Sequence, residues 1–225
     1  MDLTLLGTGS PQPSPLRAGP SNHLVIGKSS LMVDCGNGAV VRMAAAGLDA
    51  KDLDYIFLTH MHSDHTIDLA HVLITGWIRY RTKPITIVGP VQTREFVRRV
   101  NNAYEFDIKL RKLHRRVGDD VMEVRVLEVG DGENVETDGW RATAIEVDHG
   151  YVKPALGFVF EDESAKLMIS GDTTGCDAVR NASAGADLLL LELMRASQEK
   201  DPHDADLEQI PELRRRIMRT HNSPQ

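Results

Sequence analysis

The sequence predicts an α/β protein with two mixed β-sheets, and two patterns lead to this prediction. Short apolar runs of strand length recur along the chain, and most end at Gly, Pro, Asp or Asn, as strands do. Some of these runs are adjacent in the sequence, whereas others alternate with helical segments. A purely parallel, doubly wound sheet therefore fits poorly, and two mixed sheets between layers of helices fit better.

The individual elements follow from the same patterns. The expected strands cover residues 3–6, 23–26, 31–33, 55–58, 85–88, 121–129, 140–147, 156–160, 166–169 and 187–191. Helical spacing appears over residues 39–46, 68–81, 93–104, 176–182 and 207–219, and Asp204 or Asp206 is a suitable cap for the last of these. The Gly-, Pro- and Ser-rich stretch 7–21 lies between two strands and is interpreted as a surface loop.

Size and composition narrow the class of protein. The chain has 225 residues, of which 41% are hydrophobic and 26% charged, and no change in composition marks a boundary, so residues 1–225 are expected to form one soluble domain. No apolar run is long enough to cross a bilayer, which predicts a cytoplasmic protein without a membrane partner. The two cysteines exclude a four-thiolate zinc site, so any metal site must rely on histidine and carboxylate.

The most distinctive stretch is THMHSDH at residues 59–65, which holds three of the nine histidines. Alternate residues of an extended segment point the same way, so His60 and His62 are placed to bind one cation through neutral imidazole. The turn that follows is placed to present Asp64 and His65 to a second position close by. The alternative interpretation is a polar loop with surface histidines.

Two later segments have the form expected for the rest of such a site. VDHGYVKP places His149 just past the strand 140–147, and LMISGDTTG places Asp172 just past the strand 166–169. A rigid scaffold of strands can bring residues from distant parts of the chain to one point, because each residue lies at the end of a strand. Without the THMHSDH motif, the alternative interpretation is that His149 is an ordinary loop histidine and that Asp172 is a turn or cap residue.

These residues resemble the signature of the metallo-β-lactamase fold superfamily, in which HxHxDH is followed by a later His and by GD[TS]. LGTGSP at residues 6–11 and VDCGNG at residues 33–38, where Asp34 ends a strand, are also typical of it. The resemblance implies an αββα sandwich that binds two zinc ions, with Mn²⁺ or Fe²⁺ as alternatives. The implied ligands are His60, His62 and His149 for one ion, Asp64 and His65 for the other, and Asp172 as the bridge.

The resemblance also implies a mechanism. Two close cations lower the pKa of a shared water, polarise the substrate and hold its leaving oxygen. Asp64 is the residue expected to orient that water, as metal ligand and general base.

Within the superfamily, the chain is most similar to the ribonuclease Z-like and arylsulfatase-like branch. There, a carboxylate follows the strand after GD[TS], and a later His-Ser/Thr motif supplies a proton to the leaving group. Glu192 and His221 match these features, which predicts a proton relay with His221 as general acid. The alternative interpretation is a surface carboxylate and a terminal histidine without a catalytic role.

Some features depart from an enzyme that processes the 3′ end of transfer RNA. The family's arm that grips the transfer-RNA elbow lies between the later His and GD[TS], but only 22 residues separate His149 from Asp172 here. That length suffices for two strands and a turn, so no RNA exosite is expected. The ribonuclease Z loop PxKxRN is matched only at Pro13 and Arg17, and SDHTIDL at residues 63–69 is similar to the arylsulfatase-like group.

A further departure concerns the second metal position, which the superfamily closes with a final histidine. The sequence contains no such residue before Gln225. This indicates a truncated form of a longer chain. If the chain ends here, the second metal would be weakly bound or absent.

The leading functional hypothesis is a zinc-dependent hydrolase whose partner is a small phosphate or sulfate ester. The segment 79–116 holds eleven Lys/Arg and three acidic residues, a net of +8, and is interpreted either as a wall that attracts an anion or as a solvated helical face. The alternatives are a ribonuclease Z-like endoribonuclease for transfer-RNA 3′ ends and a non-catalytic binding module with an incomplete metal shell. The sequence is also compatible with a homodimer.

Overall fold

The structure is a computed structural model that describes residues 1–115 and 122–193. The chain divides into two compact units, Met1–Glu128 and Val129–Gln225. The single domain expected over residues 1–225 stays a prediction. Among the described residues, no helix has the length and apolar character that a membrane span requires.

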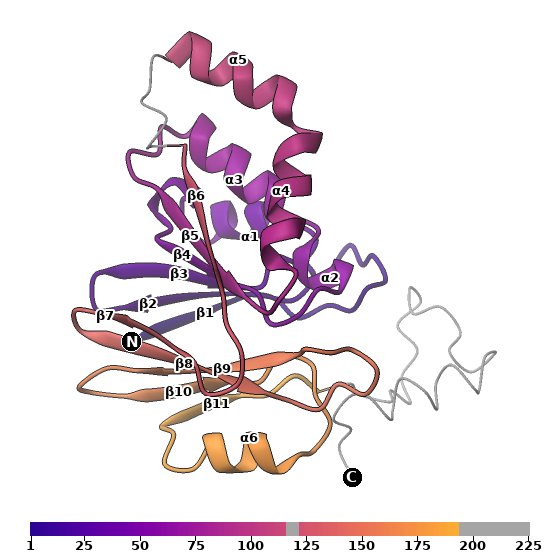
Figure 1. The fold of residues 1–225 in the computed structure, drawn as a ribbon, viewed down its shortest axis with the longest axis vertical. Helices are drawn as coiled ribbons and strands as arrows, with labels where there is room; N and C mark the ends of the chain where they lie inside the picture. Colours follow the sequence, from indigo (N-terminus) through magenta and orange to yellow (C-terminus); the bar gives the residue numbers. More distant parts are fainter. Residues whose placement is uncertain (116–121, 194–225) are drawn as a thin grey trace, which may run out of the picture. The chain divides into compact units, whose positions relative to one another are not determined.

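The first unit is built on a six-stranded mixed sheet with the strand order β1-β2-β3-β4-β5-β6 (Figure 1). The first three strands pair antiparallel, whereas β3 to β6 run parallel. Because parallel neighbours need crossover connections, helices separate these strands in the sequence. The strands are β1 Asp2–Gly7, β2 Ser21–Ile26, β3 Ser29–Val33, β4 Tyr55–Phe57, β5 Ile85–Gly89 and β6 Val124–Glu128.

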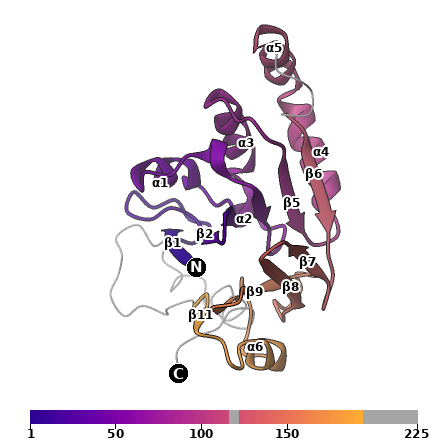
Figure 2. The ribbon, with the colours of Figure 1, turned by 90° about the vertical axis from the view of Figure 1, so that its left-hand side faces the viewer.

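The helical segments of the first unit are α1 Ala39–Ala45, the 3₁₀ turn η1 Ala50–Asp52, α2 Ser63–Thr66, α3 Leu69–Ile78, α4 Thr93–Ala103 and α5 Glu105–Arg115. Of these, α1, α3 and α4 bury apolar residues in the core of the unit. In α3, Leu69, Val72, Leu73 and Trp77 recur at helical spacing and lie in one core with β4 and β5. Figure 2 shows α4 running beside β5 and β6, which it contacts.

The second unit contains a five-stranded mixed sheet with the order β11-β10-β9-β8-β7. Its elements are β7 Asn134–Thr137, β8 Trp140–Glu146, β9 Leu156–Glu161, β10 Lys166–Ile169, α6 Asp177–Ala182 and β11 Leu188–Leu190. Only the β10–β11 pair is parallel. β9 is central and is buried along nearly its whole length, which explains its continuous apolar run.

The prediction of two mixed sheets with flanking helices is confirmed, and each predicted strand corresponds to a strand in the structure. The sequence analysis missed β7, η1, α2 and α5. The strand β7 is polar and lies at a sheet edge, and α5 alternates charged with apolar residues, so neither has a strong apolar run. The helix expected over residues 207–219 lies outside the described residues.

Candidate functional site

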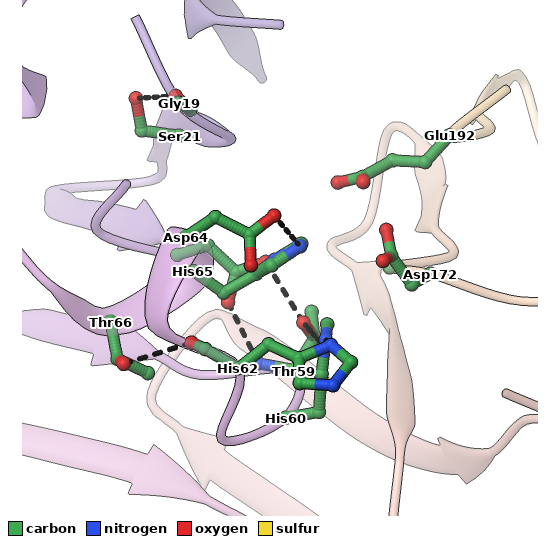
Figure 3. Close-up of polar contacts among 12 residues, drawn as sticks. Gly19, Ser21, Thr59, His60, His62, Asp64, His65, Thr66, Asp172 and Glu192 are labelled. Atoms are coloured by element: carbon green, nitrogen blue, oxygen red, sulfur yellow. Dashed lines mark hydrogen bonds and ion pairs between the residues drawn. The ribbon is translucent and has the colours of Figure 1, made fainter. Parts of the chain in front are cut away.

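His60 and His62 lie in the extended segment between β4 and α2, with their rings close together (Figure 3). His60 Nε2 is 2.9 Å from His62 Nδ1, and the ring centroids are 4.7 Å apart. His60 is fully buried, whereas His62 is exposed. The prediction that alternate residues of this segment point to a common position therefore holds for the geometry of the pair.

Asp34 lies beneath the histidines at the end of β3, in the left-handed region with φ 61°, which Asp adopts more readily than most residues. Its Oδ1 accepts a hydrogen bond from the Thr59 backbone N–H at 2.8 Å. Its Oδ2 accepts from the Thr59 hydroxyl at 2.9 Å and from His65 Nδ1 at 2.8 Å. All three residues are buried, so the carboxylate is held by charge-assisted bonds in a region of low dielectric.

This network fixes which ring nitrogen of two histidines carries the proton. Because the carboxylate of Asp34 only accepts, His65 donates from Nδ1, and its Nε2 keeps the lone pair. The Thr59 hydroxyl gives its single proton to Asp34, so its oxygen accepts from His60 Nδ1 at 3.0 Å. His60 therefore also presents a lone pair on Nε2, which is the form in which imidazole binds metals.

Asp64 and His65 lie on the short helix α2, and the chain around them is packed tightly. His65 Nε2 is 3.7 Å from Asp64 Oδ2. A Cβ added to Gly36 would lie 2.5 Å from the Asp64 carbonyl oxygen and 2.4 Å from the carbonyl carbon of Gly19. Only glycine at position 36 lets the two neighbouring loops approach this closely, and that approach positions the turn bearing Asp64.

A cavity of about 280 Å³ opens beside Asp64. Its walls come from the loop 7–21, from Asn37 and from α2 with the residue that follows it. Arg17 is the cationic side chain of this lining, and Ser10, Gln12 and Ser63 supply uncharged polar groups. The cavity thus offers a positive charge and hydrogen-bonding groups next to an expected metal ligand.

In the second unit, His149 and Asp172 are brought together from the segments that follow β8 and β10. His149 Nε2 is 3.5 Å from Asp172 Oδ2, and both side chains are buried. Gly171 adopts φ 59° immediately before Asp172, a conformation that glycine tolerates and that turns the chain out of β10. The sequence prediction that these two residues share one end of their sheet is therefore correct within this unit.

Glu192 follows β11, and its backbone N–H donates to the Ser170 hydroxyl at 3.1 Å. Ser170 follows β10, so Glu192 and Asp172 are carried on neighbouring loops (Figure 3). His221, the expected proton donor, lies outside the described residues.

Most basic side chains of segment 79–116 form ion pairs with acidic side chains of the same unit. These are Arg79–Asp49, Lys83–Asp54, Arg94–Glu128, Arg98–Glu95, Arg99–Glu95, Lys109–Glu105 and Arg111–Asp107. Arg81 is buried and donates to the carbonyls of Leu53 and Ala50 at 2.7 Å. Among the described residues, this segment therefore fits the solvated helical face better than a wall that attracts anions.

Thr59 is a site residue to which the sequence analysis assigned no role. Its hydroxyl joins Asp34 to His60. The signal that was available is a hydroxyl residue directly before the first histidine of THMHSDH. Asp34 was noted as typical after β3, but its bonds to Thr59 and His65 require coordinates.

Comparisons with known proteins identify the family of the chain. The family model described as "Beta-lactamase superfamily domain" matches residues 30–221. Ribonuclease Z of Mycobacterium bovis is 38% identical over 198 residues, which are 87% of this chain and 71% of that protein. Ribonuclease Z of Mycolicibacterium paratuberculosis is 40% identical over the same shares of the two chains.

Solved structures give the same fold at lower sequence identity. The short form of human tRNase Z (ELAC1) is similar, with a TM-score of 0.67 and 24% identity, over 99% of this chain and 93% of that one. The metallo-β-lactamase fold protein YhfI from Bacillus subtilis gives a TM-score of 0.66 and 18% identity, over 88% and 74% of the two chains. At these identities the structural likeness bears on the fold alone.

Proposed function

The chain belongs to the β-lactamase superfamily, with the metallo-β-lactamase fold, and is a metal-dependent hydrolase of ester bonds; on this premise we propose that it is a ribonuclease Z-like endoribonuclease whose substrate is RNA. One observation carries the choice of substrate: proteins named ribonuclease Z share 38% to 40% of their residues with this chain over 71% of their length. This reverses the order that the sequence alone favoured, in which a small phosphate or sulfate ester came first.

The donor atoms fit a divalent metal. His60 Nε2 and His62 Nδ1 face each other at 2.9 Å, and two neutral imidazoles accept that distance only if a proton or a cation lies between their nitrogens. His65 Nε2 and an Asp64 oxygen form a second nitrogen–oxygen donor pair. Nitrogen and carboxylate donors without thiolate suit zinc, and also Mn²⁺ and Fe²⁺.

We assign the ligands accordingly, by the superfamily signature and by the geometry within each unit. His60, His62 and His149 would hold one zinc ion, Asp64 and His65 would hold a second, and Asp172 would contribute to both. When bound, the metals supply Lewis acidity toward the phosphate and lower the pKa of coordinated water.

The residues around the ligands have separate tasks. Asp64 orients the attacking water and accepts its proton, as a general base beside the phosphorus. Arg17 faces the cavity next to Asp64, where its guanidinium is suited to a phosphate of the substrate backbone. Glu192 and His221 form the relay that returns a proton to the leaving oxygen, with His221 as the donor.

Cleavage of a precursor transfer RNA with a 3′ trailer tests this proposal. The protein loaded with zinc should release the trailer, and His62→Ala should lower kcat/KM by at least about 10²-fold, as expected when a metal ligand is lost. His114→Ala is a matched control, because His114 is an exposed histidine of α5. Equal activity of the wild type and His62→Ala would refute the ligand assignment.

Parallel assays separate the alternative functions. Hydrolysis of nitrophenyl phosphate or sulfate without cleavage of any RNA would return the small-ester hypothesis to first place. Failure to hydrolyse either class with zinc bound would favour a binding module. Measuring bound zinc per chain by mass spectrometry also tests the ligand assignment: zinc bound to the wild type and lost from His62→Ala is the predicted result.

A further inference from the structure

The short turn after His149 carries an unusually exposed aromatic side chain. Tyr151 is 96% exposed, the highest value among the large hydrophobic side chains of the described residues. Lys153, two positions later, is also exposed. One aromatic ring and one cation therefore lie in solvent within four residues of an expected metal ligand.

The turn is well ordered by hydrogen bonds. Val152 N–H donates to the His149 carbonyl at 3.2 Å, which closes the turn, and Gly150 adopts φ 63°. Asp148 accepts from Gly150 N–H at 3.1 Å through its side chain and from Thr174 N–H at 2.8 Å through its carbonyl. These bonds tie the backbone of the turn to the loop that follows Asp172.

We propose that this turn binds a nucleotide of the RNA substrate next to the scissile phosphodiester, and the inference rests on the proposed function. Tyr151 stacks on the base, and Lys153 contacts a flanking phosphate. A base presents a flat π-face to an aromatic side chain whatever its sequence, and the backbone presents a negative charge to a cation nearby. The backbone of this closed turn loses little conformational freedom on binding.

The surroundings of Tyr151 favour a nucleotide over a protein partner. The sequence neighbours Val152 and Pro154 are half-buried, so they add little apolar surface beside the ring, whereas protein interfaces centre on buried apolar clusters. A single exposed ring beside a cation suits one base and one phosphate.

The stretch between His149 and Asp172 carries no long insertion. The residues between His149 and Asp172 form this turn, β9, the turn 162–165 and β10. Within this described stretch, nothing else extends outward to hold an RNA at a distance. A short stretch of this kind can contact only nucleotides close to the reacting phosphate, and the turn of Tyr151 supplies an aromatic and a cationic group for that contact.

A double-mutant cycle between protein and substrate tests the stacking. Precursor transfer RNA is prepared intact and with one abasic nucleotide at each of the three positions on either side of the cleavage site. Tyr151→Ala should raise KM for the intact RNA by about tenfold, within the range for loss of one stacked base, whereas Tyr151→Phe should not. At one position, the abasic RNA should lose no further affinity when Tyr151 is also replaced.

Lys153 is tested by the salt dependence of KM. Lys153→Ala should reduce the slope of log KM against log salt concentration by about one unit, because one phosphate contact is lost. Lys153→Arg should restore the slope. Phe106→Ala serves as the control, since Phe106 is another exposed aromatic residue, 79% exposed on α5, and its slope and KM should match the wild type.

The outcomes distinguish the two proposals. If the wild-type protein cleaves RNA but the losses from Tyr151→Ala and the abasic nucleotides add at every position, the nucleotide contact is wrong and the proposed function stands. If zinc-loaded wild-type protein cleaves no RNA, both fall together.

Discussion

The Asp34 carboxylate lies 2.8 Å from His65 Nδ1 and also accepts the hydroxyl proton of Thr59, which in turn contacts His60. One buried carboxylate thus orients two expected ligands that belong to different metal positions. Replacing it should weaken both positions together rather than one at a time.

The variant Asp34→Asn keeps the volume but loses the charge. An amide cannot accept all three donors through its single oxygen, so His65 and His60 lose their fixed orientation. Zinc affinity, measured by competition with a chromogenic chelator, should fall by about 10- to 100-fold. Asp54→Asn is the control, because Asp54 accepts from Ser30 and Lys83 and should leave zinc binding unchanged. Unaltered zinc affinity in Asp34→Asn would contradict the role of the network.

Thr59 permits a sharper test of the same network. Thr59→Val preserves the shape but removes the hydroxyl, which leaves the His60 Nδ1–H buried without its acceptor. We expect a loss of about 1–3 kcal/mol in the free energy of unfolding, and nitrogen NMR of the His60 ring should show a mixture of tautomers. Thr59→Ser should retain the wild-type spectrum. An identical spectrum for Thr59→Val would show that the hydroxyl does not set the tautomer.

Gly36→Ala should disturb the turn that carries Asp64. The new Cβ would meet backbone atoms at 2.4 Å and 2.5 Å, so the loops must separate, at a cost of about 1–3 kcal/mol measured by urea unfolding. Gly130→Ala is a matched control, because the nearest atom to its Cβ is 3.8 Å away, at the end of the flexible Glu133 side chain. Equal stability of the two variants would mean that the close approach at position 36 is not required.

His23 predicts a pH dependence of stability. Its ring is buried in β2, with Nε2 2.9 Å from the Ser30 hydroxyl oxygen, and burial lowers the pKa of His23. Below the usual histidine pKa of about 6.5, the unfolded chain binds a proton that the folded chain does not. Stability is therefore lost as the pH falls from about 6.5 toward the folded pKa. In urea unfolding at pH 7.5 and 5.5, His23→Gln should lose less stability than the wild type, and an unchanged loss would refute this.

Much of the fold could be predicted from the sequence because most strands have an apolar run with a clear end. The prediction of residues 166–169 coincides with β10, Lys166–Ile169. The edge strand β7 and the helix α5 have no such run, and they form because tertiary pairing and packing compensate for weak local signals.

The site could be predicted in part. His60 and His62 could be paired because side chains alternate in direction along an extended segment. His149 and Asp172 could be placed because each follows the end of a predicted strand. The bonds from Asp34 to Thr59 and His65 do not, because Asp34 is 25 residues from Thr59 in the sequence and the pairing depends on how β3 and β4 align.

The turn 162–165 has a consequence for how such proteins vary. Asp162 closes it by accepting from Ser164 and Ala165, and the pair Lys166↔Glu161 sets the register beneath it. An inserted segment of any length would begin and end at the paired residues Glu161 and Lys166. His149 and Asp172 would then keep their places at the other end of the hairpin. A segment inserted at this turn would therefore add a new binding surface without moving His149 or Asp172. Grafting an arm there is a route to new specificity.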